Sequence, residues 1–210
     1  NVAVGDEAGT AITTGDNNSV LGFEALKTNA TTSNNTAIGY QSLLVNVADL
    51  NTAVGSLSLI ANTSGSLNVA VGAFALNANT TAAGNTAVGY ASLEENTTGA
   101  NNVAIGFKSL EANTTGVVNT AVGSTALDAN TSGGYNTAMG YASLSANTTA
   151  NNNTALGYSS LAANTTGAGN VAVGAQALLA STTGASNTAV GYNSGAAVTT
   201  GASNVAVGYL

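Results

Sequence analysis

Apolar residues recur along the chain at a nearly constant interval of 17 residues. A motif close to Asn-Thr/Val-Ala-Val/Ile-Gly marks each repeat, and only the interval from Asn35 to Asn51 is shorter, at 16 residues. The motif starts at Asn1, Asn18, Asn35, Asn51, Asn68, Asn85, Asn102, Asn119, Asn136, Asn153, Asn170, Asn187 and Asn204. We number positions 1–17 within the unit N-[TV]-A-[VI]-G-Y-x-[AS]-L-x-x-N-T-T-G-x-x. Helical-pair repeats need about 33 residues, so this period predicts one coil of a parallel β-solenoid.

Two apolar columns run through the repeats. Position 4 is apolar in every copy and position 9 is leucine in most of them, and we expect position 9 to point inward. In the central repeats these structural columns are Val88, Ile105 and Val122 at position 4, and Leu93, Leu110 and Leu127 at position 9. Position 5 is glycine throughout, which indicates a bend or a close backbone approach. We therefore expect a short strand at positions 2–5, with its copies stacked about 4.8 Å apart.

Positions 6–11 are compatible with two local structures. The frequent aromatic residue at position 6 and the leucine at position 9 are three residues apart, which favours a short helical turn. The small residue at position 8 allows a second short strand instead. We favour the strand, because the strand at positions 2–5 sets the stacking geometry of the whole coil.

Asparagine recurs at position 12 and is usually followed by threonine and glycine, which is typical of a turn. In the central repeats these asparagines are Asn96, Asn113 and Asn130. Stacked asparagines can hydrogen-bond to one another, so we expect an amide ladder along the solenoid.

The chain forms one repeat domain, 1–210, of twelve coils and a partial thirteenth. Two coils, 1–17 and 187–203, depart from the consensus in the same way. Each has glycine at position 9 (Gly9, Gly195) and an apolar residue at position 12 (Ile12, Val198), which replaces the missing leucine. They are either end coils or marks of a longer repeat. Because the chain starts without Met or a signal peptide, we expect it to be part of a longer protein.

The composition excludes many functions. The chain has two Lys and Arg residues together, no His, no Cys and a net charge of −7. Without His or Cys, ordinary zinc, haem or iron–sulfur sites and the usual catalytic triads cannot form, and we expect no cofactor and no enzyme activity. Two lysines cannot neutralise a phosphate backbone, so nucleic acid is not an expected partner. No apolar run is long enough for membrane insertion.

Acidic residues recur at one repeat position in the middle of the chain. Glu94, Glu111 and Asp128 occupy position 10 of successive repeats, so they should stack about 5 Å apart. One interpretation is a weak cation site that relieves the like-charge repulsion. The other, which we favour, is a solvated edge helped by the nearby Lys108.

The motif Asn-Thr-Ala-Val-Gly-Tyr-x-Ser-Leu resembles repeats of known fibrous proteins. It is similar to the head repeats of YadA-type trimeric autotransporter adhesins, and more similar to the NTAVGY-type repeats of bacteriophage tail fibres and bacterial surface proteins. The resemblance covers the whole chain. It implies a left-handed parallel β-roll, three chains packed side by side, and an adhesive or receptor-binding role.

These observations lead to one functional expectation and one alternative. We expect an extracellular structural fibre segment with an adhesive role, on a cell surface or a virion. Its expected partners are further copies of the chain, as a trimer or an end-to-end filament, and cell-surface polysaccharide. The alternative is a specific glycan- or ice-binding solenoid module.

Overall fold

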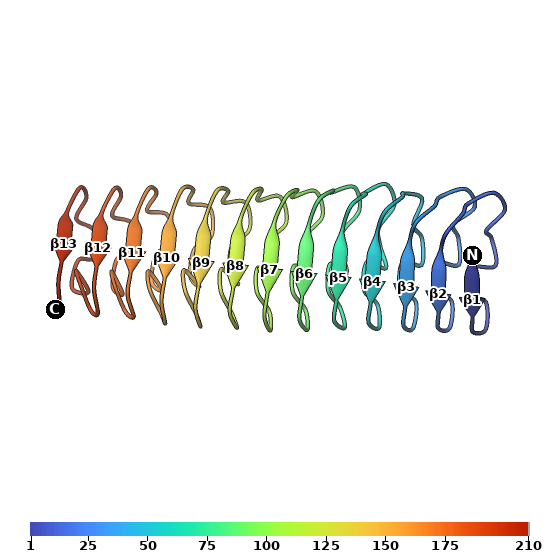
Figure 1. Ribbon diagram of the computed structural model, residues 1–210. Helices are drawn as coiled ribbons and strands as arrows, with labels where there is room; N and C mark the ends of the chain where they lie inside the picture. Colours follow the sequence, from blue (N-terminus) through green and yellow to red (C-terminus); the bar gives the residue numbers. More distant parts are fainter. Residues whose placement is uncertain (210) are drawn as a thin grey trace.

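The structure is a computed structural model that describes residues 1–209 of the chain. Thirteen strands of three residues each form a single sheet, in which every strand pairs in parallel with its neighbours in chain order. The strands are β1 (Val2–Val4), β2 (Ser19–Leu21), β3 (Thr36–Ile38), β4 (Thr52–Val54), β5 (Val69–Val71), β6 (Thr86–Val88), β7 (Val103–Ile105), β8 (Thr120–Val122), β9 (Thr137–Met139), β10 (Thr154–Leu156), β11 (Val171–Val173), β12 (Thr188–Val190) and β13 (Val205–Val207). They follow one another along a straight rod (Figure 1).

The strand register confirms the predicted solenoid with one coil per repeat. In the pairing of β6 with β7, Thr86, Ala87 and Val88 lie opposite Val103, Ala104 and Ile105, which occupy the same repeat positions. Residues at the same repeat position therefore lie directly above one another in successive coils. With a strand spacing of about 4.8 Å, twelve coils give a rod ~58 Å long.

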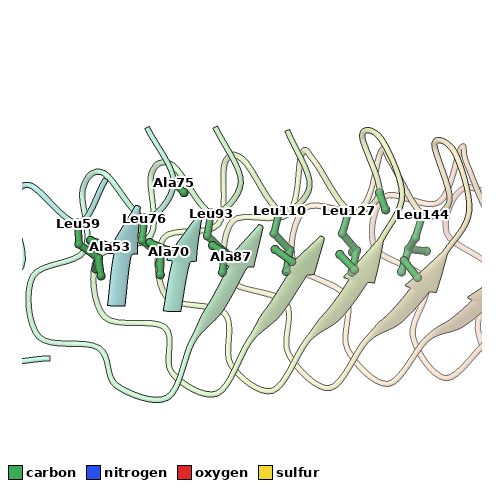
Figure 2. Close-up of a cluster of buried hydrophobic side chains, with 14 of the residues drawn as sticks. Ala53, Leu59, Ala70, Ala75, Leu76, Ala87, Leu93, Leu110, Leu127 and Leu144 are labelled. Carbon is green, nitrogen blue, oxygen red and sulfur yellow. The ribbon is translucent and has the colours of Figure 1, made fainter. Parts of the chain in front are cut away.

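The core is narrow and consists mainly of alanine and leucine. The residue at position 3 of each strand points inward; it is alanine in every strand except β2, which has Val20. The leucine at position 9 comes back from the opposite side to meet it. Figure 2 shows this row of leucines from Leu59 to Leu144 beside the alanines of the strands. Ala87, Ala104, Leu93 and Leu110 have no exposed surface. Stacking of coils buries this row, because one coil alone could not cover its own apolar residues.

The position-4 column lies on the outer surface of the rod. Side chains alternate between the two faces of a strand, so an inward alanine at position 3 sends positions 2 and 4 outward. Ile105 is 40% exposed, and Val88 and Val122 are half-buried. Position 4 therefore forms an apolar column on the surface. The strand residue that packs in the core is the alanine at position 3.

The expected second strand at positions 6–11 is wrong, and the alternative helical turn is absent from residues 1–209 as well. This segment is a series of turns in which every second residue has a positive φ. In one coil these residues are Gly106 (φ 135°), Lys108 (φ 55°) and Leu110 (φ 52°). Alternating signs of φ give neither an extended strand nor a helix. A Cβ on Gly106 would lie 2.5 Å from the carbonyl oxygen of Gly123, which explains the glycine at position 5.

Backbone hydrogen bonds hold these turns to the coils on both sides. The Gly106 and Lys108 amides donate to Val88 and Tyr90 in the preceding coil, at 2.8 and 3.0 Å. The Leu110 amide donates in the other direction, to Ala126 of the following coil at 3.0 Å. Backbone hydrogen bonds therefore link neighbouring coils on the turn side of the rod almost as regularly as they do in the sheet.

The one short coil, 35–50, loses its residue in the turn. The Asn46 Nδ2 donates to the carbonyl of Ala48 at 2.6 Å, whereas in other coils the equivalent acceptor lies three residues after the asparagine. The next strand still pairs in register, with Thr36 opposite Thr52. The deletion thus leaves the sheet unchanged.

Candidate functional site

The asparagines at position 12 form a buried amide ladder. The Asn113 Nδ2 donates to the Oδ1 of Asn96 at 2.8 Å and to the carbonyl of Gly116 at 3.1 Å. The Asn130 Nδ2 in turn donates to the Oδ1 of Asn113 at 2.9 Å. All three asparagine side chains are fully buried. Each amide therefore closes its own turn and links it to the neighbouring coil.

A second buried asparagine column stands at position 1, where the sequence indicated only a corner. The Asn102 amide donates to the Oδ1 of Asn85 at 2.9 Å, and the Asn102 Nδ2 donates to the carbonyl of Gly116 at 2.9 Å. Gly116 thus accepts from the asparagines of both columns. The signal for this column was present in the sequence, since every motif begins with asparagine.

The position-12 ladder ends at coil 170–186, where serine replaces asparagine. The Oδ1 of Asn164 and the Oγ of Ser181 are buried and have no hydrogen-bond partner within the described part of the chain. The shorter serine side chain cannot reach the asparagine in the coil before it. This end of the ladder is a local weak point.

We expect Ser181→Asn to stabilise the rod. The new amide would donate to the Oδ1 of Asn164 and to the carbonyl of Gly184, as its counterparts do in the other coils. The gain in the free energy of unfolding should be about 1 kcal/mol, the net value of a typical hydrogen bond. Denaturant unfolding of both proteins measures it, with Ser181→Ala as the control that restores no donor. A destabilised Ser181→Asn variant would contradict this account of the ladder.

The structure places Glu94, Glu111 and Asp128 along one edge of the rod, and Lys108 neutralises part of that edge. The Lys108 Nζ donates to a Glu111 carboxylate oxygen at 2.8 Å and lies 5.8 Å from the centre of the Phe107 ring. Burial and the neighbouring Glu111 raise the pKa of Glu94, and burial raises the pKa of Asp128. No group of three or more acidic side chains suited to a metal ion forms within residues 1–209.

The raised pKa of Glu94 predicts a pH-dependent stability. A carboxyl whose pKa is higher in the folded than in the unfolded chain destabilises the fold once it is ionised. The variant Glu94→Gln should therefore be more stable than the parent protein at about pH 7, and the difference should disappear at about pH 3, where the carboxyl is protonated in both states. Melting temperatures at the two pH values measure it. The exposed Glu95→Gln is the matched control, and an equal gain from both variants would contradict the assignment.

A second charged cluster lies near the start of the rod. The Lys27 Nζ donates to Glu24 at 2.7 Å and also contacts Glu7 in the preceding coil. Glu24 further accepts from the Nε2 of Gln41 at 2.6 Å, and these hydrogen bonds, first of all that of Lys27, lower the pKa of Glu24. All charged side chains lie between Asp6 and Asp128, so residues 129–210 carry none.

The outer face of the sheet is long and uncharged, and one of its two rows is apolar throughout. Positions 2 and 4 of all thirteen strands point outward, and neither position holds a charged residue in any coil. Position 2 is mainly threonine or valine, and position 4 is always apolar. Exposed examples are Val69, Ile105 and Met139. A regular face of this kind, uninterrupted along the rod, is a candidate contact surface.

Next to this face, aromatic rings at position 6 form stacked pairs. The ring centres of Tyr90 and Phe107 are 5.6 Å apart, as are those of Tyr141 and Tyr158. Two other pairs, Phe23–Tyr40 and Tyr192–Tyr209, stack at 5.6 and 5.3 Å. Smaller residues separate the pairs. The aromatic column is therefore not continuous. It is interrupted at Ser56 and Ala73, at Ser124 and at Ala175.

An open concavity of about 460 Å³ lies at the variant coil 187–203. Its lining residues are Asn193, Gly195, Ala196, Ala197 and Val198, none of which is titratable. In this coil Gly195 takes the place of the inward leucine, and Val198 packs against the core instead. The concavity offers apolar contact and amide groups but no acid, base or nucleophile.

Within the described residues no helix is long and apolar enough to cross a bilayer. Comparison of the chain with protein-family models, curated proteins and solved structures finds no match.

Proposed function

We propose that the chain is an extracellular structural fibre segment with an adhesive role, on a cell surface or a virion. The observation that carries the proposal is the repetition of one coil, with the same strand pairing from β1 to β13 and an amide ladder through the central coils. Such a chain builds length and stiffness, since every added coil buries the face of the one before it.

The outer face supports lateral association of rods. A strip ~58 Å long and ~10 Å wide covers roughly 600 Å², near the ~800 Å² per partner of a stable interface. Because the strip has no charge, no pair of like charges opposes packing of one copy on another. The resemblance to trimeric adhesins points to three chains, and end-to-end filaments are the other form of self-association in this proposal.

Light scattering tests the self-association. The mass of the full chain should exceed the 20.1 kDa of one copy, and electron microscopy should show rods or bundles. Introducing one charge into the strip with Ile105→Lys should lower the mass, because a buried unpaired lysine is costly. Thr115→Lys, on the turn side, is the matched control. A chain that stays monomeric at all concentrations would falsify the lateral contact.

The adhesive role is expected to rest on many weak, uncharged contacts. Repeated side chains offer equivalent contacts along the rod, and such contacts gain strength through multivalency. Exposed Tyr, Thr and Asn groups suit neutral cell-surface polysaccharide. Attachment of the labelled chain to whole cells should therefore change little between low and high salt, because salt screens only charges. Attachment lost at high salt would refute this mode of binding.

One observation favours a second candidate, ice binding. Thr36, Thr52, Thr86 and further threonines at position 2 point outward from the sheet next to an apolar row, and valine takes their place in some coils. Such an array can order water at fixed intervals. An ice-recrystallisation assay on the same sample separates the candidates, because a fibre that binds cell surfaces but not ice leaves the growth of ice crystals unchanged.

A further inference from the structure

The interruptions in the aromatic column differ along the rod. In the levels that follow Tyr158, Ala175 stands between the exposed rings of Tyr158 and Tyr192, one coil from each. A similar single interruption, at Ser124, lies between Phe107 and Tyr141. Only the interruption at Ala175 lies in the uncharged part of the chain, residues 129–210.

The spacing at Ala175 suits one inserted ring. Tyr158 and Tyr192 belong to coils two levels apart, about 9.6 Å along the rod, so a ring at the Ala175 level would lie ~5 Å from each. This separation falls in the range of stacked ring pairs. It also matches the 5.6 and 5.3 Å between ring centres of the two neighbouring pairs, Tyr141–Tyr158 and Tyr192–Tyr209.

The backbone beneath this gap is fixed. The Gln176 amide donates to the carbonyl of Tyr158 at 2.8 Å, and the Asn193 amide donates to that of Ala175 at 3.0 Å. The Cα positions that carry the two rings are thus held by the same hydrogen bonds that hold the coils together. The two-coil spacing of Tyr158 and Tyr192 is therefore set by the fold.

The chain itself places a ring beside another interruption, the two-level one at Ser56 and Ala73. At Ala73 the next residue, Phe74, packs edge-on against Tyr90, with 5.8 Å between ring centres. This contact shows that a position-7 side chain reaches the ring of the following coil. The residue that corresponds to Phe74 in the Ala175 coil is Gln176, which has a side-chain amide in place of a ring.

We infer that the gap over Ala175, between Tyr158 and Tyr192, binds a hexopyranose ring of a neutral polysaccharide. The C–H bonds of the sugar face meet the electron-rich faces of the two tyrosines. Gln176 and Asn193 carry side-chain amides and the two tyrosines carry hydroxyls, so these coils contain uncharged hydrogen-bonding groups. No charged residue lies in this part of the rod, so the surface matches an uncharged sugar rather than an acidic one. The inference gives a ligand class to the proposed adhesive role and rests on it.

The test uses the full chain and a panel of soluble neutral oligosaccharides built from glucose, mannose or galactose, with oligogalacturonate as the acidic comparison. Saturation-transfer NMR detects binding, and calorimetry gives the affinity. We expect at least one neutral oligosaccharide to bind and oligogalacturonate not to bind. Ala175→Tyr fills the gap, and Tyr192→Ala removes one wall. Each should weaken binding by about tenfold or more, as expected for the loss of an aromatic stacking contact.

Tyr40→Ala is the matched control, since it removes an equally exposed ring that does not border a single-level gap. It should bind as the parent protein does, and melting temperatures check that all variants fold. Unchanged binding by Ala175→Tyr, or no binding of any neutral oligosaccharide, overturns the inference. If the parent chain and Ala175→Tyr then attach equally to whole cells, the adhesive role stands without this site. If neither attaches, the adhesive role fails as well.

Discussion

Asn113→Ala is expected to lower the free energy of unfolding by roughly 3 kcal/mol or more. The Asn113 side chain donates to Asn96 and to Gly116 and accepts from Asn130, all in a fully buried environment. Its removal leaves buried polar groups without partners, and each such group costs about 1–3 kcal/mol. Denaturant unfolding measures the loss. Hydrogen exchange should show the earliest opening in the coils around residue 113.

Thr115→Ala is the matched control for this change. Thr115 belongs to the same turn but is exposed. Its substitution should change stability by no more than about 0.5 kcal/mol. Similar losses in the two variants would mean that the ladder is not what holds the turn side together.

Leu110→Ala should destabilise the rod by about 2–5 kcal/mol, the range for a buried leucine that leaves a cavity. We expect a value in the upper part of that range. The backbone around Leu110 is bonded to the coils on both sides, so it cannot collapse into the space left by the side chain. Thermal and denaturant unfolding give the size of the effect.

Glu111→Ala, at the adjacent position, is the comparison. Glu111 forms a partly exposed ion pair with Lys108, and such pairs contribute about 0–1 kcal/mol. Its removal should be nearly neutral. Equal losses from Leu110→Ala and Glu111→Ala would contradict the inward orientation of position 9.

The coil length, the parallel stacking and the inward leucines could be predicted from spacing alone, because only stacked coils bury a leucine every 17 residues. The role of position 3 could not be read as directly. Alanine contributes little apolar surface, so the hydrophobic pattern is dominated by the larger residues at position 4, such as Val88 and Ile105. Strand alternation puts position 3 on the face opposite to positions 2 and 4, and the frequent threonine at position 2 would then have indicated that Ala87 and Ala104 point inward.

The conformation of positions 6–11 was beyond what the sequence could reveal. Leucine and lysine seldom have positive φ, yet Leu110 and Lys108 both do. No local preference indicates this conformation. It exists because hydrogen bonds to two neighbouring coils stabilise it together, and that cooperation appears only once the coils are stacked. The spacing of the aromatic pairs, by contrast, is visible in the sequence. The structure adds that these rings are exposed and that the paired rings stack on one another.

The short coil 35–50 shows that chain length and rod geometry are uncoupled at one corner. Its turn, from Val47 to Leu50, has one residue fewer than the others, yet the strands on either side keep their register. A corner that tolerates a deletion without a shift in the sheet should also tolerate an insertion, since exposed turns accept extra residues more easily than paired strands. Loops added at this corner should therefore project from the rod without altering its length. The same corner is the place to graft a peptide for display on the rod.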